Sequence, residues 1–270
     1  MQAQRLPAQR GSWWLLEGFR LFRRNPPLIT ALTLLYLLAV QGIMVLLPGI
    51  GPILLPLFLP VLTLIVANGC RLVDEGRAPG QATLLLGIRG NGPAMLRLGG
   101  LQLAGALLLV LLNTLLNDGV DPFAQIESAG GGVPNLGEGA PGANPAAEAA
   151  MLGALLRLLL LATPLIVAFW FAPFLVGWDR VGPLKAVFFS AVASWRNWRP
   201  MLMFGMATIA VAGIVPGFLL IAFSQVSGMA LSAAFIALRM LLVFLVAPVL
   251  TASVYVSYRD IFHSAVDTNA

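Results

Sequence analysis

The sequence predicts an all-α membrane protein with six transmembrane helices and with amphipathic helices along its cytoplasmic side. Hydrophobic residues make up 59% of the 270 residues and charged residues only 10%, whereas soluble domains carry about 25% charged residues. Six apolar segments are long enough to cross a hydrocarbon core of about 30 Å. Lys and Arg gather in alternate connections between these segments.

The six predicted spans follow one another along a single integral membrane domain, residues 1–270. The first is preceded by basic residues and is longer than the apolar part of a signal peptide, about 7–15 residues, so we expect it to remain as a helix. The predicted spans are Leu28–Leu47, Ile53–Cys70, Leu96–Leu116, Ala150–Val176, Met201–Phe223 and Met229–Ser257.

The start of the second span is rich in proline, at Pro48, Pro52, Pro56 and Pro60. A proline inside a helix removes a backbone hydrogen bond and bends the axis. The pattern favours a bent helix whose freed carbonyls are satisfied by neighbouring groups. A broken helix that lines a polar cavity is the alternative.

The distribution of positive charge predicts that both termini lie in the cytoplasm. Lys and Arg are enriched in cytoplasmic loops. They occupy the N-terminal arm, the connections after the second and fourth spans and the C-terminal end, and the other connections carry none. Residues 117–149 are acidic and rich in Gly and Pro, which predicts a flexible extracytoplasmic loop. The chain therefore reads as a multi-pass protein of a bacterial-type inner membrane.

Two amphipathic segments are too polar to span and are predicted to lie in the membrane interface. In residues 12–24, Trp14, Leu15, Phe19 and Phe22 are expected to face lipid, opposite Glu17, Arg20 and Arg24. In residues 183–199 one face is apolar and rich in aromatic residues at helical spacing. Its members are Leu184, Val187, Phe188, Ala191, Trp195 and Trp198.

The order of these features suggests three parallel repeats, residues 11–75, 80–180 and 183–262. Each unit would hold an interfacial helix, an Arg/Asn/Pro corner and a transmembrane hairpin. Pro60 precedes Arg71 by the same number of residues as Pro248 precedes Arg259. A chance match in so biased a composition is the alternative.

Four stretches resemble an uncharacterised family of bacterial integral membrane proteins. They are Gly11–Phe19, Ala168–Pro173, Pro183–Pro200 and Ser257–Phe262. The chain is more distantly similar to the membrane domain attached to some glycerophosphodiester phosphodiesterases. The resemblance implies a fold and an inner-membrane location, and it implies no activity.

No motif for catalysis, for a cofactor or for a metal is present. Cys70 and His263 are the only residues of their kinds, so the chain can form neither an intrachain disulfide nor a His-x-x-His or Cys-x-x-Cys type of zinc motif. Cys70 is expected to be a packing residue and His263 a solvated tail residue. The basic residues alternate with apolar stretches, which fits membrane topology better than nucleic-acid binding.

Arg157 and Arg239 are the only ionisable residues predicted to lie within spans. A functional interpretation makes them contacts for an anion or a lipid phosphate. A structural interpretation has them reach to the interface or bond to carbonyls freed by prolines.

The function favoured by the sequence is a non-enzymatic membrane protein that organises lipids, a partner membrane protein or a second copy of itself. Anionic headgroups would contact Arg20, Arg23, Arg24, Arg196 and Arg199. These charges could equally serve only to fix topology. The rival function is a transporter or channel for a small or anionic solute, in which Arg157 and Arg239 converge on a polar cavity.

Overall fold

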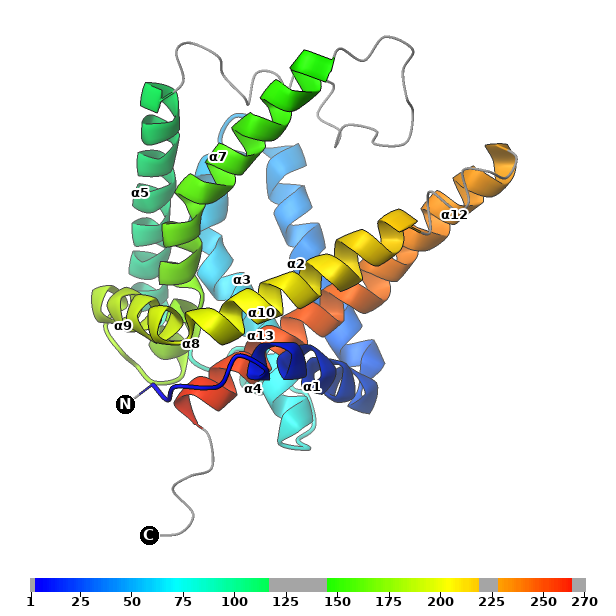
Figure 1. The fold of residues 1–270 in the computed structure, drawn as a ribbon. Coiled ribbons are helices and arrows are strands. Elements are labelled where there is room, and N and C mark those ends of the chain that lie inside the picture. The colour runs from blue at the N-terminus through cyan, green and yellow to red at the C-terminus, as the bar shows by residue number, and fades with distance from the viewer. Residues whose placement is uncertain (1–2, 117–144, 219–227, 264–270) are drawn as a thin grey trace.

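A computed structural model describes residues 3–116, 145–218 and 228–263, which form helices and no strand. Figure 1 shows that these helices meet at one end of the molecule and spread apart at the other. The elements are α1 (Arg10–Arg24), α2 (Pro26–Leu46), α3 (Gly51–Asp74), α4 (Gln81–Leu84), α5 (Gly92–Leu116), α7 (Pro145–Phe169), α8 (Ala172–Gly177), α9 (Pro183–Arg196), α10 (Trp198–Ile209), η1 (Ala210–Ile214), α12 (Gly228–Leu241), η2 (Leu242–Val246) and α13 (Ala247–Phe262).

Six helical segments in the described residues are long and apolar enough to cross a membrane, which confirms the predicted number of spans. The protein buries little of them: 11% of the apolar window in the fifth and 6% in the sixth. Surfaces so apolar and so exposed need lipid around them. The spans are Pro26–Leu46, Gly51–Asp74, Gly92–Leu116, Leu156–Gly177, Trp198–Phe218 and Ala233–Phe262.

The predicted extracytoplasmic loop at 117–149 is only partly covered by the structure. Helix α7 begins at Pro145, so the last residues of that predicted loop are helical. Proline suits the first turn of a helix, because the N–H that it lacks would have no partner there. Residues 117–144 lie outside the described residues, as does the end of the predicted span Met201–Phe223.

Helix α3 is continuous from Gly51 to Asp74, with Pro56 and Pro60 inside it. The helix is not interrupted, so the broken-helix alternative is wrong, whereas the bend that the proline pattern favoured stays a prediction. Helix α5 lies close to the proline-rich half of α3. A Cβ atom on Gly99 would lie 2.2 Å from the carbonyl oxygen of Leu57, so only glycine allows this approach.

Helix α1 is a packed part of the protein. It lies along α13 and against α10, and Trp14, Leu21 and Phe22 are buried in these contacts. The expectation that Trp14 and Phe22 face lipid is therefore wrong, whereas Phe19 is exposed. Helical periodicity identifies an apolar face but not what covers it.

Two glycines allow α1 to approach its neighbours closely. A Cβ on Gly18 would lie 2.1 Å from the Ser253 hydroxyl of α13, and one on Gly11 would lie 2.0 Å from the Pro200 carbonyl of α10. Both glycines lie on the buried face of α1, so their spacing marks the side of α1 that contacts protein.

Helix α9 presents two different faces. Small residues, Ala186, Ser190, Ala193 and Ser194, are buried towards α7 and α8. The predicted apolar face is largely exposed, with Leu184, Phe188, Trp195 and Trp198 between 52% and 78% accessible. Its position in the interface stays a prediction, as do the three repeats. In the second unit the corresponding segment holds only the single-turn helix α4.

Candidate functional site

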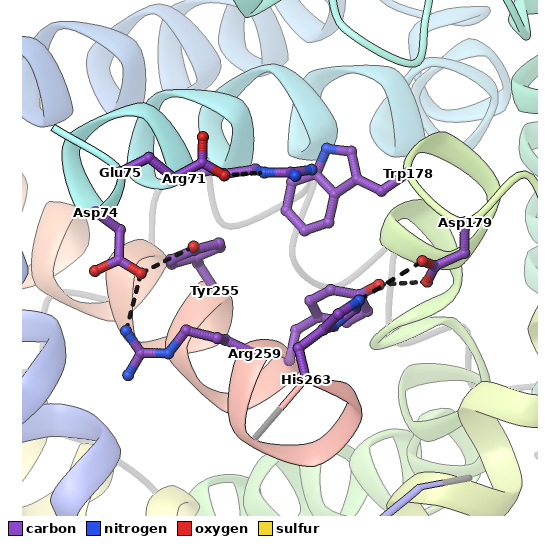
Figure 2. A pocket seen from close by; sticks show the side chains of 9 residues that line it. Arg71, Asp74, Glu75, Trp178, Asp179, Tyr255, Arg259 and His263 are labelled. Atoms are coloured by element: carbon purple, nitrogen blue, oxygen red, sulfur yellow. Dashed lines mark hydrogen bonds and ion pairs between the residues drawn. The ribbon is translucent and has the colours of Figure 1, made fainter. Parts of the chain in front are cut away.

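A polar pocket lies where the C-terminal ends of α3 and α13 meet the residues that follow α8 (Figure 2). Its volume is about 330 Å³. We use the name junction for helix α1 together with the residues that line this pocket. The pocket is lined by Arg71, Asp74, Glu75, Trp178, Asp179, Tyr255, Tyr258, Arg259 and His263.

Asp74, in the last turn of α3, receives groups from two other helices. Tyr255 and Arg259 stand one turn apart on α13, so both reach the same carboxylate. The Tyr255 hydroxyl donates to Asp74 at 3.1 Å and the Arg259 guanidinium at 2.9 Å. Arg24, at the end of α1, lies 3.4 Å from its other oxygen.

Arg259 extends this network to a second carboxylate pair. It lies 2.9 Å from Glu17 on α1 and 3.6 Å from Asp260. The Asp260 side chain is only 8% exposed and accepts from Arg10 at 2.7 Å. This hydrogen bond raises the pKa of Arg10, against the opposing effect of burial. The ion pairs therefore join α1, α3 and α13 at one level.

Asp179, just after α8, joins the same pocket through aromatic residues. The Tyr258 hydroxyl donates to its carboxylate, and the Nε2 of His263 lies 3.8 Å from it. The Tyr258 ring packs against Phe174, Trp178 and Phe262 at centroid separations of 5.1–5.2 Å. His263, predicted to be a solvated tail residue, instead contacts Tyr258 and is half exposed.

Arg71 and Trp178 form one wall of the pocket. The guanidinium of Arg71 lies 5.2 Å from the Trp178 ring, and Phe174 stacks on that ring at 5.2 Å. The indole N–H donates to Asn68 at 2.7 Å. Burial raises the pKa of Glu75, but hydrogen bonds from Arg71 and Arg77 outweigh it, so its net pKa is lowered.

The polar side chains of this pocket bond to one another and so hold helices together. Each of Asp74, Glu75, Asp179 and Asp260 accepts hydrogen bonds from the protein itself. Within the described ranges no group of three or more His, Cys, Asp or Glu could hold a metal ion. Asp74, Asp179 and Asp260 therefore connect separate helices through polar groups that are satisfied within the protein.

The structure does not bring Arg157 and Arg239 together. Arg157 is half-buried on α7 and Arg239 is exposed on α12, and these helices extend in different directions in Figure 1. Arg157 is the second residue of the candidate span Leu156–Gly177, and Arg239 is the seventh residue of the candidate span Ala233–Phe262. Both therefore lie towards the ends of their spans that are far from the junction in sequence, and their depth in the bilayer stays a prediction.

The five predicted headgroup contacts flank the starts of α2 and α10. All five side chains are exposed. Arg24 contacts Asp74, Arg23 lies 6.0 Å from the Phe19 ring and Arg199 lies 5.4 Å from the Trp198 ring. No carboxylate among the described residues pairs with Arg20, Arg23, Arg196 or Arg199.

Sequence reasoning missed Asp74, Asp179, Tyr255 and Tyr258. Their signal lay in the residues that end the spans. Asp74 follows Arg71 and Asp179 follows Trp178, in each case at the end of an apolar segment. Tyr255 precedes Arg259 by one helical turn. Nothing in the sequence shows that these ends meet in space.

The chain is similar in sequence to a known protein. The chain is 32% identical over 266 residues to a protein of Burkholderia thailandensis described as a probable inner membrane protein, covering 97% of this chain and 94% of the relative. No family model matches the chain. No solved structure matches it.

Proposed function

This chain belongs to the family of that inner membrane protein and is itself an integral, multi-pass inner-membrane protein, and we propose that it is a non-enzymatic organiser of anionic lipid. In this proposal the exposed arginines at the starts of α2 and α10 bind the headgroups. Both termini face the cytoplasm.

The orientation is supported by the segregation of basic residues. The segment that precedes α1 and the last turn of α13 lie at the same end of the molecule, because the backbone N–H of Gln4 donates to the Ile261 carbonyl at 3.0 Å. That end carries the basic connections, and Lys and Arg favour the cytoplasmic side. The junction is therefore cytoplasmic in this proposal.

The observation that carries the proposal is the contrast between two sets of arginines. Arg10, Arg71 and Arg259 are bonded to carboxylates inside the junction. Arg20, Arg23, Arg196 and Arg199 are exposed and have no such partner in the part of the chain that the structure describes. They are also close to exposed aromatic residues such as Phe19, Trp195 and Trp198.

Exposed arginines beside aromatic residues at the start of a span suit the headgroup region. Trp side chains favour this level of the bilayer, and each basic residue near an anionic membrane surface contributes about 1 kcal/mol. The transporter hypothesis gains nothing from the structure. Arg157 and Arg239 lie on separate hairpins, and neither of them lines the pocket of Figure 2.

The test counts the lipids that stay bound after mild extraction. The variant replaces Arg20, Arg23, Arg196 and Arg199 by Gln. A matched variant replaces them by Lys, and Arg5→Gln is a further control. We expect native mass spectrometry to show less phosphatidylglycerol and cardiolipin per chain in the Gln variant only, with phosphatidylethanolamine unchanged.

A Gln variant that keeps its full complement of anionic lipid would overturn the proposal. These arginines would then act only in setting topology. A cytoplasmic green fluorescent protein fused after residue 270 reports whether the variant still inserts with its C-terminus inside, so that a change of topology is not mistaken for a change of lipid binding.

A further inference from the structure

We propose that a second pocket at the junction binds a phosphate group through Arg71, Arg89 and Arg180. It shares Arg71 and Trp178 with the pocket of Figure 2 and has a volume of about 360 Å³. This inference goes beyond the proposed headgroup surface, because it concerns different arginines, which line a separate pocket.

The charge of the two pockets differs in sign. The pocket of Figure 2 is lined by two arginines and three carboxylates, Asp74, Glu75 and Asp179. The second pocket is lined by three arginines and by no carboxylate within the described residues. Arg71 is paired with Glu75, which lies outside this lining, whereas Arg89 and Arg180 have no carboxylate partner among the described residues. The net positive charge of the lining therefore favours an anion in the pocket.

The guanidinium groups keep donors available. Arg89 and Arg180 are exposed and form no ion pair with any described carboxylate. Glu75 engages only the Nε of Arg71, which leaves the terminal nitrogens of Arg71 without a bond to the described protein. Guanidinium is the side chain whose donors best match phosphate oxygens.

Arg180 occupies a backbone position that normally holds glycine. Its φ is +52°, the only positive φ of a described residue other than glycine. The N–H of Val181 donates to the carbonyl of Leu175 at 3.0 Å, which closes the turn that follows α8 and contains Arg180. A residue other than glycine is unfavourable there, so the fold alone would favour glycine. The presence of arginine therefore indicates a role for its side chain.

The opposite wall of the pocket is fixed against the end of α8. A Cβ on Gly87 would lie 2.4 Å from the Gly177 carbonyl, so the loop and α8 touch through backbone. Asn68 donates to the carbonyls of Leu84 and Leu86 at 2.8 and 3.0 Å, and Asn91 donates to that of Val176 at 2.8 Å. Arg89 and Arg180 are thus carried on backbone segments that are already positioned, which lowers the entropic cost of binding.

The apolar residues of the lining favour a ligand in which the phosphate is attached to a larger molecule. Ala82, Leu85 and Leu86 give the pocket an apolar side next to its arginines. A phosphate monoester with an attached glycerol or acyl chain would fill both parts. A lipid headgroup and a soluble phosphate share the recognised group, and the experiment separates them.

The test follows thermal unfolding of the full-length protein in a neutral detergent. Cys70 is the only cysteine and is fully buried, so a thiol-reactive fluorescent dye reports unfolding directly. The ligands are inorganic phosphate and dioctanoyl phosphatidic acid. Dioctanoylglycerol, which lacks the phosphate, and sodium chloride at matched ionic strength are the controls.

Phosphatidic acid is expected to raise the unfolding temperature, and dioctanoylglycerol and salt are not. A rise with inorganic phosphate as well identifies a site for phosphate from any source, and a rise with phosphatidic acid alone identifies a lipid site. Absence of a rise with either ligand, at concentrations up to those at which the detergent itself perturbs the protein, overturns the proposal.

Arg180→Gly is the decisive variant, because it removes the charge and relieves the left-handed backbone. Without ligand we expect a stability equal to or above that of the native protein, because glycine suits the left-handed backbone. We expect the half-maximal phosphatidic acid concentration to rise about tenfold, as for the loss of one charge-assisted bond. Arg89→Gln should act likewise, and Arg5→Gln should not. An equal response of Arg180→Gly and Arg5→Gln would overturn the site. The headgroup variant at Arg20, Arg23, Arg196 and Arg199 should retain this binding, so the two proposals fail separately.

Discussion

The indole N–H of Trp14 on α1 donates to the carboxylate of Asp260 on α13 at 3.1 Å, across 246 residues of sequence. The Trp14 side chain is 1% exposed, so its N–H has no access to water. An N-terminal helix that sequence alone assigned to the lipid surface is thereby fixed to the last helix of the protein.

Replacing Asp260 by Ala should destabilise the protein by about 2–3 kcal/mol. The change leaves the buried Trp14 N–H without a partner and Arg10 without its charge-assisted bond. Unfolding would be followed by SDS titration in mixed micelles, with the dye at Cys70 as the reporter. Arg77→Gln, which removes an exposed contact with Glu75, should cost less than about 1 kcal/mol. Equal losses in the two variants would mean that Asp260 does not hold α1.

The approach of α1 to α13 should depend on Gly18. In Gly18→Ala the new methyl group would meet Ser253, so α1 must move away, at a cost of about 1–3 kcal/mol. Gly205, on α10, has open space around a Cβ, and Gly205→Ala should stabilise by up to about 1 kcal/mol. Comparison of the two variants by the same titration separates a steric effect from the general effect of alanine in a helix. A tolerated Gly18→Ala would refute the close contact.

The number of spans could be predicted from sequence because hydropathy and helix length are local properties. Each of the six spans is apolar enough to be recognised alone. The boundary at Pro145 was missed because the residues after it are four alanines and the charged Glu148, which give no apolar signal for a span.

The site could not be predicted because it is built from chain ends that are distant in sequence. Asp74, Asp179 and Arg259 lie after three different spans, and hydropathy gives no information on which ends meet. Arg157 and Arg239 attracted attention because charges within apolar segments are costly. They lie towards the ends of their candidate spans, and the structural interpretation, in which they reach to the interface, stays a prediction.

The stability of the protein should depend on the side-chain amide of Asn68. Its oxygen accepts from Trp178 and its nitrogen donates to the carbonyls of Leu84 and Leu86. Asn68→Ala should cost about 2–3 kcal/mol, because three buried groups lose their partner. Asn68→Asp should be at least as harmful despite its similar size, since a carboxylate would face two carbonyl oxygens. An Asp variant as stable as the native protein in the SDS titration would show that the amide nitrogen makes no essential bond.

Arg239 should be accessible from the extracytoplasmic side alone. In a Cys70→Ala background, a cysteine at position 239 is expected to react with a membrane-impermeant maleimide in whole cells with a permeabilised outer membrane. It should not react in inverted vesicles. Met206, exposed on α10 within the span, should be unreactive from both sides when replaced by cysteine. Labelling of position 239 from both sides would instead indicate a water-filled pathway and would favour a transporter.

The exposed face of α9 should lie at the depth of the lipid headgroups and upper acyl chains. Trp195 is 78% exposed and Trp198 is 52% exposed, and a Trp that faces the interface is quenched by lipids brominated near the headgroup but poorly by aqueous acrylamide. In protein reconstituted into such lipids, Trp195→Phe with Trp198→Phe should remove a large share of the lipid quenching and little of the acrylamide quenching. The opposite result would place α9 in water. Arg199, in the first turn of α10, would then be out of reach of a headgroup, because its guanidinium lies 5.4 Å from the Trp198 ring. The same would hold for Arg196, the last residue of α9 and the neighbour of Trp195.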